Sequence, residues 1–192
     1  MVCFRKGYSI SGFTFLEDIP GTIGGAITTN AGTYNNNIAD LVLEVEWFDA
    51  AHNVVRIIKH NCQKGAILPN KDGVVLGAKL KASPGDYKSI LDEMLETKRR
   101  RYLNQPRQYP NAGSVFKHVL KDDQEIPAWK LIDEVGLKGY SIGNVMVSDQ
   151  HSGFIIATGE CLGSDVVKLV NECITRVNNK FGIKLELEWR LV

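Results

Sequence analysis

The residues best suited to contact a ligand form a glycine-rich stretch near the start of the chain. They are Pro20, Gly21, Thr22, Ile23, Gly24, Gly25 and Ala26, followed by Asn30, Ala31 and Gly32. Because glycine has no side chain and accepts positive φ, backbone N–H groups can converge there on an anion such as a diphosphate. The spacing matches neither the Walker loop nor the GxGxxG dinucleotide fingerprint. A turn that only lets two backbones pass closely therefore stays an equally good interpretation.

Two side chains in the second half of the chain are suited to proton chemistry, Ser114 and Glu188. Ser114 follows Asn-Ala-Gly, a context that is typical of a turn. Glu188 lies in a segment whose strand-like alternation places it on one face with Glu186 and Arg190. Water alone could cover that face. The residues by themselves therefore assign no role to either side chain.

The composition excludes several classes of protein. With 44% hydrophobic and 23% charged residues and a net charge of +1, the chain is typical of a soluble globular protein that does not bind nucleic acid. We interpret the basic run at residues 98–101 as a solvated helix end. The four cysteines lack CxxC spacing and the four histidines lack metal-ligand spacing, so we expect reduced thiols, a cytoplasmic location and no metal site. No apolar run is long enough to span a membrane.

The first half of the chain reads as β-rich, with irregular glycine loops. Alternating apolar residues predict strands at residues 41–48, 54–58 and 73–80. Ser83 and Pro84 are typical of a helix start, with the serine as N-cap and the proline in the first helical position. We expect this helix to end before Asn104, because Pro106 disfavours helix ahead of it. Residues 104–111 are the best candidate for a linker.

The second half of the chain mixes helices and strands. The pattern predicts a helix at residues 127–135, strands at 141–147 and 153–158, a helix capped by Ser164 and closed by Gly182, and a terminal strand at 184–191. These elements indicate the α+β class. We expect a domain boundary after residue 103, with domains at 1–103 and 104–192.

The glycine-rich stretch and several later segments resemble one known family. PGTIGGA followed by NAG resembles the second flavin-contacting loop of the UDP-N-acetylenolpyruvoylglucosamine reductases, also called UDP-N-acetylmuramate dehydrogenases or the MurB family. Later segments resemble the family's AGSxFK, KLIEEAGLKG, IGGAQVSxxHAGFI and LEPEVR motifs in order, at residues 111–117, 130–139, 142–155 and 185–190. The resemblance implies the rear part of a vanillyl-alcohol-oxidase-like FAD-binding domain at 1–103, followed by an α+β substrate-binding domain at 104–192.

This resemblance implies an enzyme that reduces UDP-N-acetylglucosamine enolpyruvate to UDP-N-acetylmuramate in peptidoglycan precursor synthesis. FAD would take hydride from NADPH and pass it to C3 of the enolpyruvyl group, and C2 of the enolate-like species would then need a proton. By the family's motifs, Ser114 matches the proton donor and Glu188 the glutamate that assists at the enolate. Lys117 and His118 match substrate-binding positions. The glycine-rich stretch would hold the diphosphate side of FAD.

Three departures from the family's pattern favour an alternative. Where the family has an active-site arginine in FGYRxS, this chain has Ala66 and Ile67 after Gly65, and Lys64 offers only a point charge nearby. Loss of one such contact typically costs about two to three orders of magnitude in rate. His118 replaces the asparagine of FKNP, and nothing resembles the family's earlier GGGSN-like flavin segment. The alternative is a degenerate or fragmentary relative, with weak FAD binding, that binds a UDP-sugar or a complementing N-terminal polypeptide without catalysis.

Overall fold

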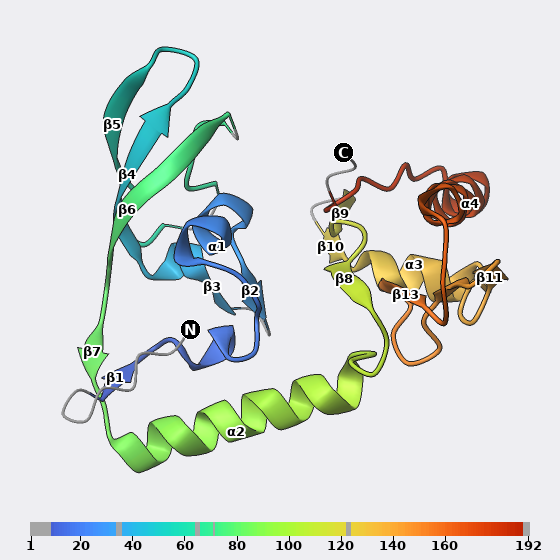
Figure 1. Ribbon diagram of the computed structural model, residues 1–192, viewed down its shortest axis with the longest axis horizontal. Coiled ribbons are helices and arrows are strands. Elements are labelled where there is room, and N and C mark those ends of the chain that lie inside the picture. Colours follow the sequence, from blue (N-terminus) through green and yellow to red (C-terminus); the bar gives the residue numbers. More distant parts are fainter. Residues whose placement is uncertain (1–8, 34–35, 64–65, 71, 122–123, 190–192) are drawn as a thin grey trace. The chain divides into compact units, whose positions relative to one another are not determined.

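The computed structural model describes residues 9–33, 36–63, 66–70, 72–121 and 124–189. The chain divides into two compact units, Met1–Arg100 and Arg101–Val192, which we call the first and second units. Both contain helices and antiparallel strands (Figure 1), which confirms the α+β class. Cys3, Lys64, Gly65 and Arg190 lie outside the described residues.

A three-stranded antiparallel sheet forms the centre of the first unit. Its middle strand is β4 (Val42–Asp49), and β5 (Val54–Lys59) and β6 (Gly73–Leu80) pair with it on either side (Figure 1). The strands predicted at these three places are therefore confirmed. One face of the sheet is buried, and the core of the unit consists of Phe15, Leu16, Ile27, Ile38, Ala39, Val42, Val45, Trp47 and Ile67.

Asp49 closes the hairpin between β4 and β5. Its buried carboxylate accepts hydrogen bonds from Nε of Arg56 at 2.8 Å and from the backbone N–H of Ala51 at 3.2 Å, and it lies 2.7 Å from Nδ1 of His52. Burial raises the pKa of Asp49, but the hydrogen bonds from Arg56 and His52 outweigh burial and hold the pKa below its usual value. The turn also needs a left-handed residue, which Asn53 supplies with φ of 52°.

The glycine-rich stretch folds as a short helix rather than as the irregular loop expected from sequence. Helix α1 runs over Ile23–Thr29, and the hydroxyl of Thr22 caps it by accepting the N–H of Gly25 at 3.1 Å. Asn30 ends the helix in the left-handed conformation, with φ of 49°. Shorter elements surround α1: β1 (Ile10–Ser11), η1 (Thr14–Leu16), β2 (Gly32–Thr33), β3 (Asn36–Asn37) and η2 (Ile38–Asp40).

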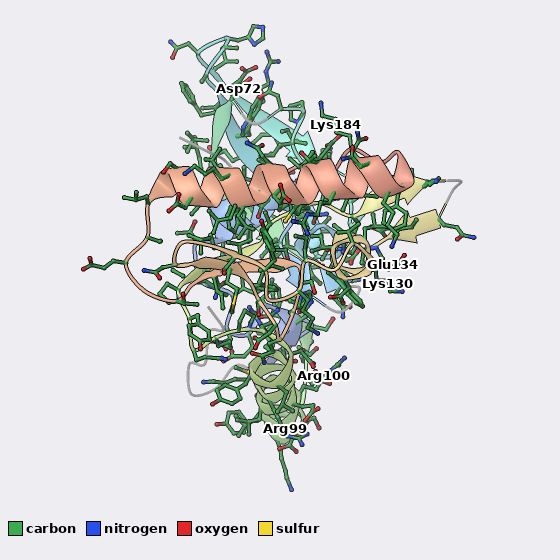
Figure 2. The ribbon with its side chains drawn as sticks, turned by 90° about the vertical axis from the view of Figure 1, so that its right-hand side faces the viewer. Asp72, Arg99, Arg100, Lys130, Glu134 and Lys184 are labelled. Carbon is green, nitrogen blue, oxygen red and sulfur yellow. The ribbon has the colours of Figure 1, made fainter. Side chains whose placement is uncertain are left out.

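The long helix α2 spans Tyr87–Asn104 and starts later than the sequence predicted. Ser83–Pro84 instead form strand β7, which pairs with β1, so the prediction that they open a helix was wrong. Asp86 provides the cap, because its carboxylate accepts the N–H of Ser89 at 2.9 Å. Figure 2 shows Arg99 and Arg100 projecting from α2, and Arg99 pairs with Glu96 at 3.5 Å on the exposed surface.

The second unit is built on a four-stranded antiparallel sheet in the order β11-β12-β13-β8. Its strands are β8 (Asn111–Ser114), β11 (Ser141–Ile142), β12 (Val145–Val147) and β13 (Phe154–Ala157). Helices α3 (Ala128–Glu134) and α4 (Gly163–Phe181) and the hairpin of β9 (Val119–Lys121) and β10 (Gln124–Ile126) complete the unit. The core contains Val115, Phe116, Ala128, Leu131, Ile132, Leu137, Val145, Val147, Ile155, Leu169, Val170, Cys173, Val177 and Leu185.

Three sequence predictions for the second unit need correction. Residues 141–147 form a hairpin rather than one strand, because Gly143 adopts φ of 58° and turns the chain between β11 and β12. The N-cap of α4 is Leu162, and Ser164 lies inside the first turn of the helix. The expected terminal strand at 184–191 is reduced within its described part to one bridge, between Phe116 and Leu187.

The described helices and side chains show no membrane span and no metal cluster. Among the helices that the structure describes, none is long and apolar enough to cross a membrane. In the described part of the chain, no group of three or more His, Cys, Asp or Glu residues lies where it could hold a metal ion. Cys62, Cys161 and Cys173 have free thiols, and burial raises the pKa of the Cys173 thiol to about 12, so this thiol is unreactive.

Candidate active site

Ser114 and Glu188 lie close together in the second unit because the closing segment of the chain runs beside the end of β8. The N–H of Glu188 donates to the carbonyl of Val115 at 2.9 Å, and the N–H of Lys117 donates to the carbonyl of Glu186 at 2.9 Å. With the antiparallel bridge between Phe116 and Leu187, these bonds place Glu188 opposite Val115, one residue from Ser114. The two residues predicted to be catalytic therefore lie on neighbouring segments at the end of β8.

The backbone around Ser114 is held by the turn that precedes it. Gly113 adopts φ of 81°, a conformation that favours glycine, and its N–H donates to Oδ1 of Asn111 at 3.1 Å. On the other side, Ser114 pairs with Phe154 of β13, and the N–H of Val115 donates to the carbonyl of Gly153 at 2.9 Å. The Ser114 side chain itself is exposed, and its hydroxyl has no hydrogen-bond partner among the described residues. The hydroxyl is therefore available to a ligand.

Lys117 supplies positive charge on the same pair of extended segments. Its ammonium lies 2.9 Å from Oε2 of Glu186. This hydrogen bond raises the pKa of Lys117, and the charges of Glu186 and Glu188 raise it further. The same contact lowers the pKa of Glu186. Lys117 therefore stays cationic at neutral pH, within the electrostatic reach of Glu188.

His118, the fourth predicted residue of this site, lies immediately before β9. Its Nδ1 is 3.0 Å from Oε1 of Glu125 on the neighbouring strand β10. Both side chains are exposed, at 56% for His118 and 71% for Glu125. The sequence did not single out Glu125, and a glutamate in a short hairpin carries no signal that would have done so.

His151 belongs to the scaffold beneath Ser114 rather than to the exposed site. Its Nδ1 accepts the N–H of Gly153 at 3.1 Å, and its ring packs edge-on against Trp129 and Phe154. Burial lowers the pKa of His151, which favours the neutral ring. The hydroxyl of the buried Ser148 stabilises the same turn, because it accepts hydrogen bonds from the N–H groups of Gln150 and His151. These contacts indicate that the segment at residues 142–155, which resembles one of the family's motifs, supports β8 structurally.

A separate pocket lies in the first unit at the start of α1 and has a volume of about 260 Å³. Its lining consists of Leu16, Ile19, Pro20, Gly21, Thr22, Ile23, Gly25, Ala26, Thr29 and Ala31. The other members of the predicted stretch serve the fold. Gly24 packs against Val75 of β6, Gly32 contacts the backbone of Asn36, and Asn30 accepts the N–H of Ala39.

The chemistry of this pocket fits an anionic group beside an apolar one. The N–H groups of Ile23 and Gly24 begin α1 and so have no partner within the helix. No charged side chain lines the pocket, and Leu16 and Ile19 provide apolar surface. Since α1 has only seven residues, the donors act through direct hydrogen bonds more than through a helix dipole.

Comparison with known proteins identifies the family. Residues 105–192 match the model of the UDP-N-acetylenolpyruvoylglucosamine reductase C-terminal domain. A UDP-N-acetylenolpyruvoylglucosamine reductase from Caldanaerobacter subterraneus is 40% identical over 188 residues, which cover 96% of this chain and 61% of the relative. The enzyme of the same name from Pseudothermotoga lettingae is 37% identical over 191 residues, 97% of this chain and 66% of the relative. The chain belongs to the UDP-N-acetylenolpyruvoylglucosamine reductase family.

A solved structure agrees with this assignment. The UDP-N-acetylenolpyruvylglucosamine reductase from Thermus caldophilus superposes with a TM-score of 0.73 at 33% identity, covering 95% of this chain and 64% of that chain. The chain thus spans about three fifths of the length of the reductases it matches. The match with the C-terminal domain model falls within the second unit, where Ser114 and Glu188 lie.

The structure describes one of the positions at which this chain departs from the reductase pattern quoted above. Ile67, which stands where the resemblance expects an arginine, is 4% exposed and packs in the core of the first unit. An arginine there would place a charge among apolar side chains, so this position cannot contribute an exposed cation to a site. The described residues show no substitute for it in the pocket at α1, whose lining carries no charge.

Proposed function

We propose that this chain carries the substrate site and part of the flavin site of an NADPH-dependent, FAD-mediated reductase that converts UDP-N-acetylglucosamine enolpyruvate to UDP-N-acetylmuramate. The main support is the hydrogen bond from the N–H of Glu188 to the carbonyl of Val115, the residue that follows the exposed Ser114. The free thiols agree with a cytoplasmic location.

In this proposal Ser114, Lys117 and Glu188 of the second unit each have one role. Ser114 delivers a proton to C2 of the substrate, because its hydroxyl is exposed and has no hydrogen-bond partner in the described part of the chain. Lys117 attracts the carboxylate or diphosphate of the substrate. Glu188 assists where the enolate-like charge develops.

FAD would supply the hydride, taken from NADPH, and the pocket at α1 would hold its diphosphate. The N–H of Ile23, which begins α1 and lines the pocket, and the uncharged lining support this assignment. Gly21 leaves the approach open, because no atom lies within 4 Å of the position that a Cβ would take there. The apolar side chains of Leu16 and Ile19 would exclude water from one side of the bound group.

A second candidate function is binding without catalysis, and the buried Ile67 favours it. A relative that lacks the family's arginine could still hold a UDP-sugar at Lys117 and His118. The two candidates differ in turnover, so an activity measurement separates them.

The test uses the purified chain with FAD, NADPH and the enolpyruvyl substrate. We expect a visible flavin spectrum after FAD addition and NADPH oxidation that requires the substrate. In Ser114→Ala the oxidation should fall by about two to four orders of magnitude, since general acid catalysis typically contributes that much. Ser141→Ala, at an exposed strand position away from the site, serves as the matched control.

One outcome would decide against the reductase, and another against the role of Ser114. A chain that stays colourless with FAD, yet gains thermal stability with UDP-N-acetylglucosamine, would favour binding without catalysis, because a ligand that binds the native state must stabilise it. Equal rates in the Ser114→Ala variant and the native chain would remove Ser114 from the proton-donor role.

A further inference from the structure

The contact between His118 and Glu125 determines which ring nitrogen of His118 is left for a ligand. Nδ1 of His118 lies 3.0 Å from Oε1 of Glu125. A carboxylate can only accept a hydrogen bond, so Nδ1 carries the hydrogen. In the neutral ring, Nε2 then has a lone pair and no hydrogen. Nε2 therefore gains an N–H only when the ring becomes protonated.

The other histidines of the chain provide internal references for this arrangement. His60 donates from Nε2 to the carbonyl of Gln63, and His151 accepts the N–H of Gly153 at Nδ1, so both hold their hydrogen on Nε2. His52 repeats the geometry of His118, with Nδ1 at 2.7 Å from the Asp49 carboxylate. His52 lies in the hairpin of the first unit, outside both candidate sites.

We propose that Glu125 is a positioning residue that makes substrate binding at His118 depend on pH. The proposal rests on the function above, in which His118 occupies a substrate-binding position. The protonated ring donates from Nε2 to a substrate oxygen while Nδ1 stays on Glu125. The neutral ring turns a lone pair toward the same oxygen and repels it. The asparagine of the family's FKNP motif would instead offer an amide N–H at every pH.

Among the residues that the structure describes, Glu125 is the charged partner of His118. Glu125 is the charged group in contact with the ring from β10. Lys117, the preceding residue, directs its ammonium to Glu186 instead. Affinity for a UDP-sugar should therefore fall as the pH rises and the ring loses its proton.

The first measurement tests the positioning role without any ligand. Ring ¹⁵N NMR of the full chain above pH 8 should show His118 and His52 with hydrogen on Nδ1, and His60 and His151 with hydrogen on Nε2. In E125A, the His118 signals should move toward the pattern of His60 while His52 stays unchanged. If His118 carries its hydrogen on Nε2 in the native chain, Glu125 does not position it and the proposal is overturned.

The second measurement follows the dissociation constant of UDP-N-acetylglucosamine from pH 5 to pH 8. We expect the affinity of the native chain and of the matched variant H52N to fall by about tenfold, the value of one hydrogen bond to a charged donor. H118N should show a flat profile. The same pH dependence in H118N as in the native chain would overturn the proposal. If no variant binds the sugar, the proposed function fails and the pH effect fails with it, while the NMR result still decides the role of Glu125.

Discussion

The two units differ in how completely they bury their sheets. In the second unit, α4 packs against β11 and β12, and Val147, Leu169 and Val177 have no exposed surface. In the first unit, one face of the β5-β4-β6 sheet is buried. On β5 and β6, in contrast, four large apolar side chains are more than half exposed: Val55, Ile57, Val74 and Leu76.

This difference indicates how much of each site the chain itself determines. Ser114 and Glu188 are fixed by main-chain hydrogen bonds above a closed core, so their geometry needs no further component. The pocket at α1 belongs to a unit whose sheet exposes several large apolar side chains, which is typical of a surface that contacts something else. We therefore expect the substrate side of the site to be the more robust one.

The largest effect is expected from opening the closed core of the second unit. Leu169→Ala should lower the free energy of unfolding by about 2–5 kcal/mol, because it removes a fully buried side chain and leaves a cavity. Leu120→Ala, at a residue that is 75% exposed, should change it by less than about 0.5 kcal/mol. Denaturant unfolding measures both. Equal losses in the two variants would contradict the closed core.

A smaller effect is expected from the turn that supports β8. Ser148→Ala removes the buried hydroxyl that accepts two backbone N–H groups, and the unfolding free energy should fall by about 1–3 kcal/mol. Thermal unfolding of the variant, with Ser141→Ala as an exposed control, gives the value. A loss no larger than that of the control would show that this turn does not stabilise the second unit.

In the first unit, acid should weaken the hairpin held by Asp49. Its folded-state pKa lies below the unfolded value of about 3.9, so the stabilisation is present at neutral pH and is lost as the pH falls through the folded-state pKa. Melting temperatures between pH 7 and pH 2 should therefore decline less in Asp49→Asn than in the native chain. Glu46→Gln, an exposed position on the same strand, should retain the native decline. Parallel curves for all three proteins would exclude the proposed role of Asp49.

The smallest effect on stability is expected on the exposed sheet face. Ile57→Lys should change the unfolding free energy by less than about 0.5 kcal/mol, because the side chain is 56% exposed. The variant should also associate less with itself, as size-exclusion chromatography would report. A loss of several kcal/mol would mean that this face is buried in solution, and the contrast between the two units would disappear.

Most of the fold could be predicted because strands and helices leave clear periodicities. The strands at 42–49, 54–59 and 73–80 and the helix at 128–134 follow from alternation and from helical spacing. The start of α2 was predicted wrongly because the sequence indicated the wrong N-cap residue. Asp86 rather than Ser83 caps α2, because Ser83 pairs with Ser11 of a strand more than seventy residues earlier. Such long-range pairing leaves no local signal.

The candidate site was predictable only through the resemblance of its motifs. Periodicity cannot bring Ser114 beside Glu188, because their proximity depends on a single bridge between segments about seventy residues apart. The glycine-rich stretch indicated a pocket, but it did not indicate that part of the stretch folds as a helix. Thr22 caps the start of this helix, and Asn30 caps its end. Glu125 and Ser148 act through contacts that no motif announced.

We propose that the end of β8 at Ser114 and the segment at Glu188 beside it bind the UDP-sugar. A titration of the ¹⁵N-labelled chain with UDP-N-acetylglucosamine, followed by amide NMR, tests it most directly. We expect shift changes to concentrate at residues 114–118 and 186–188 and to vanish in Lys117→Met. Changes confined to the first unit, or changes of equal size in the Lys117→Met variant, would contradict it.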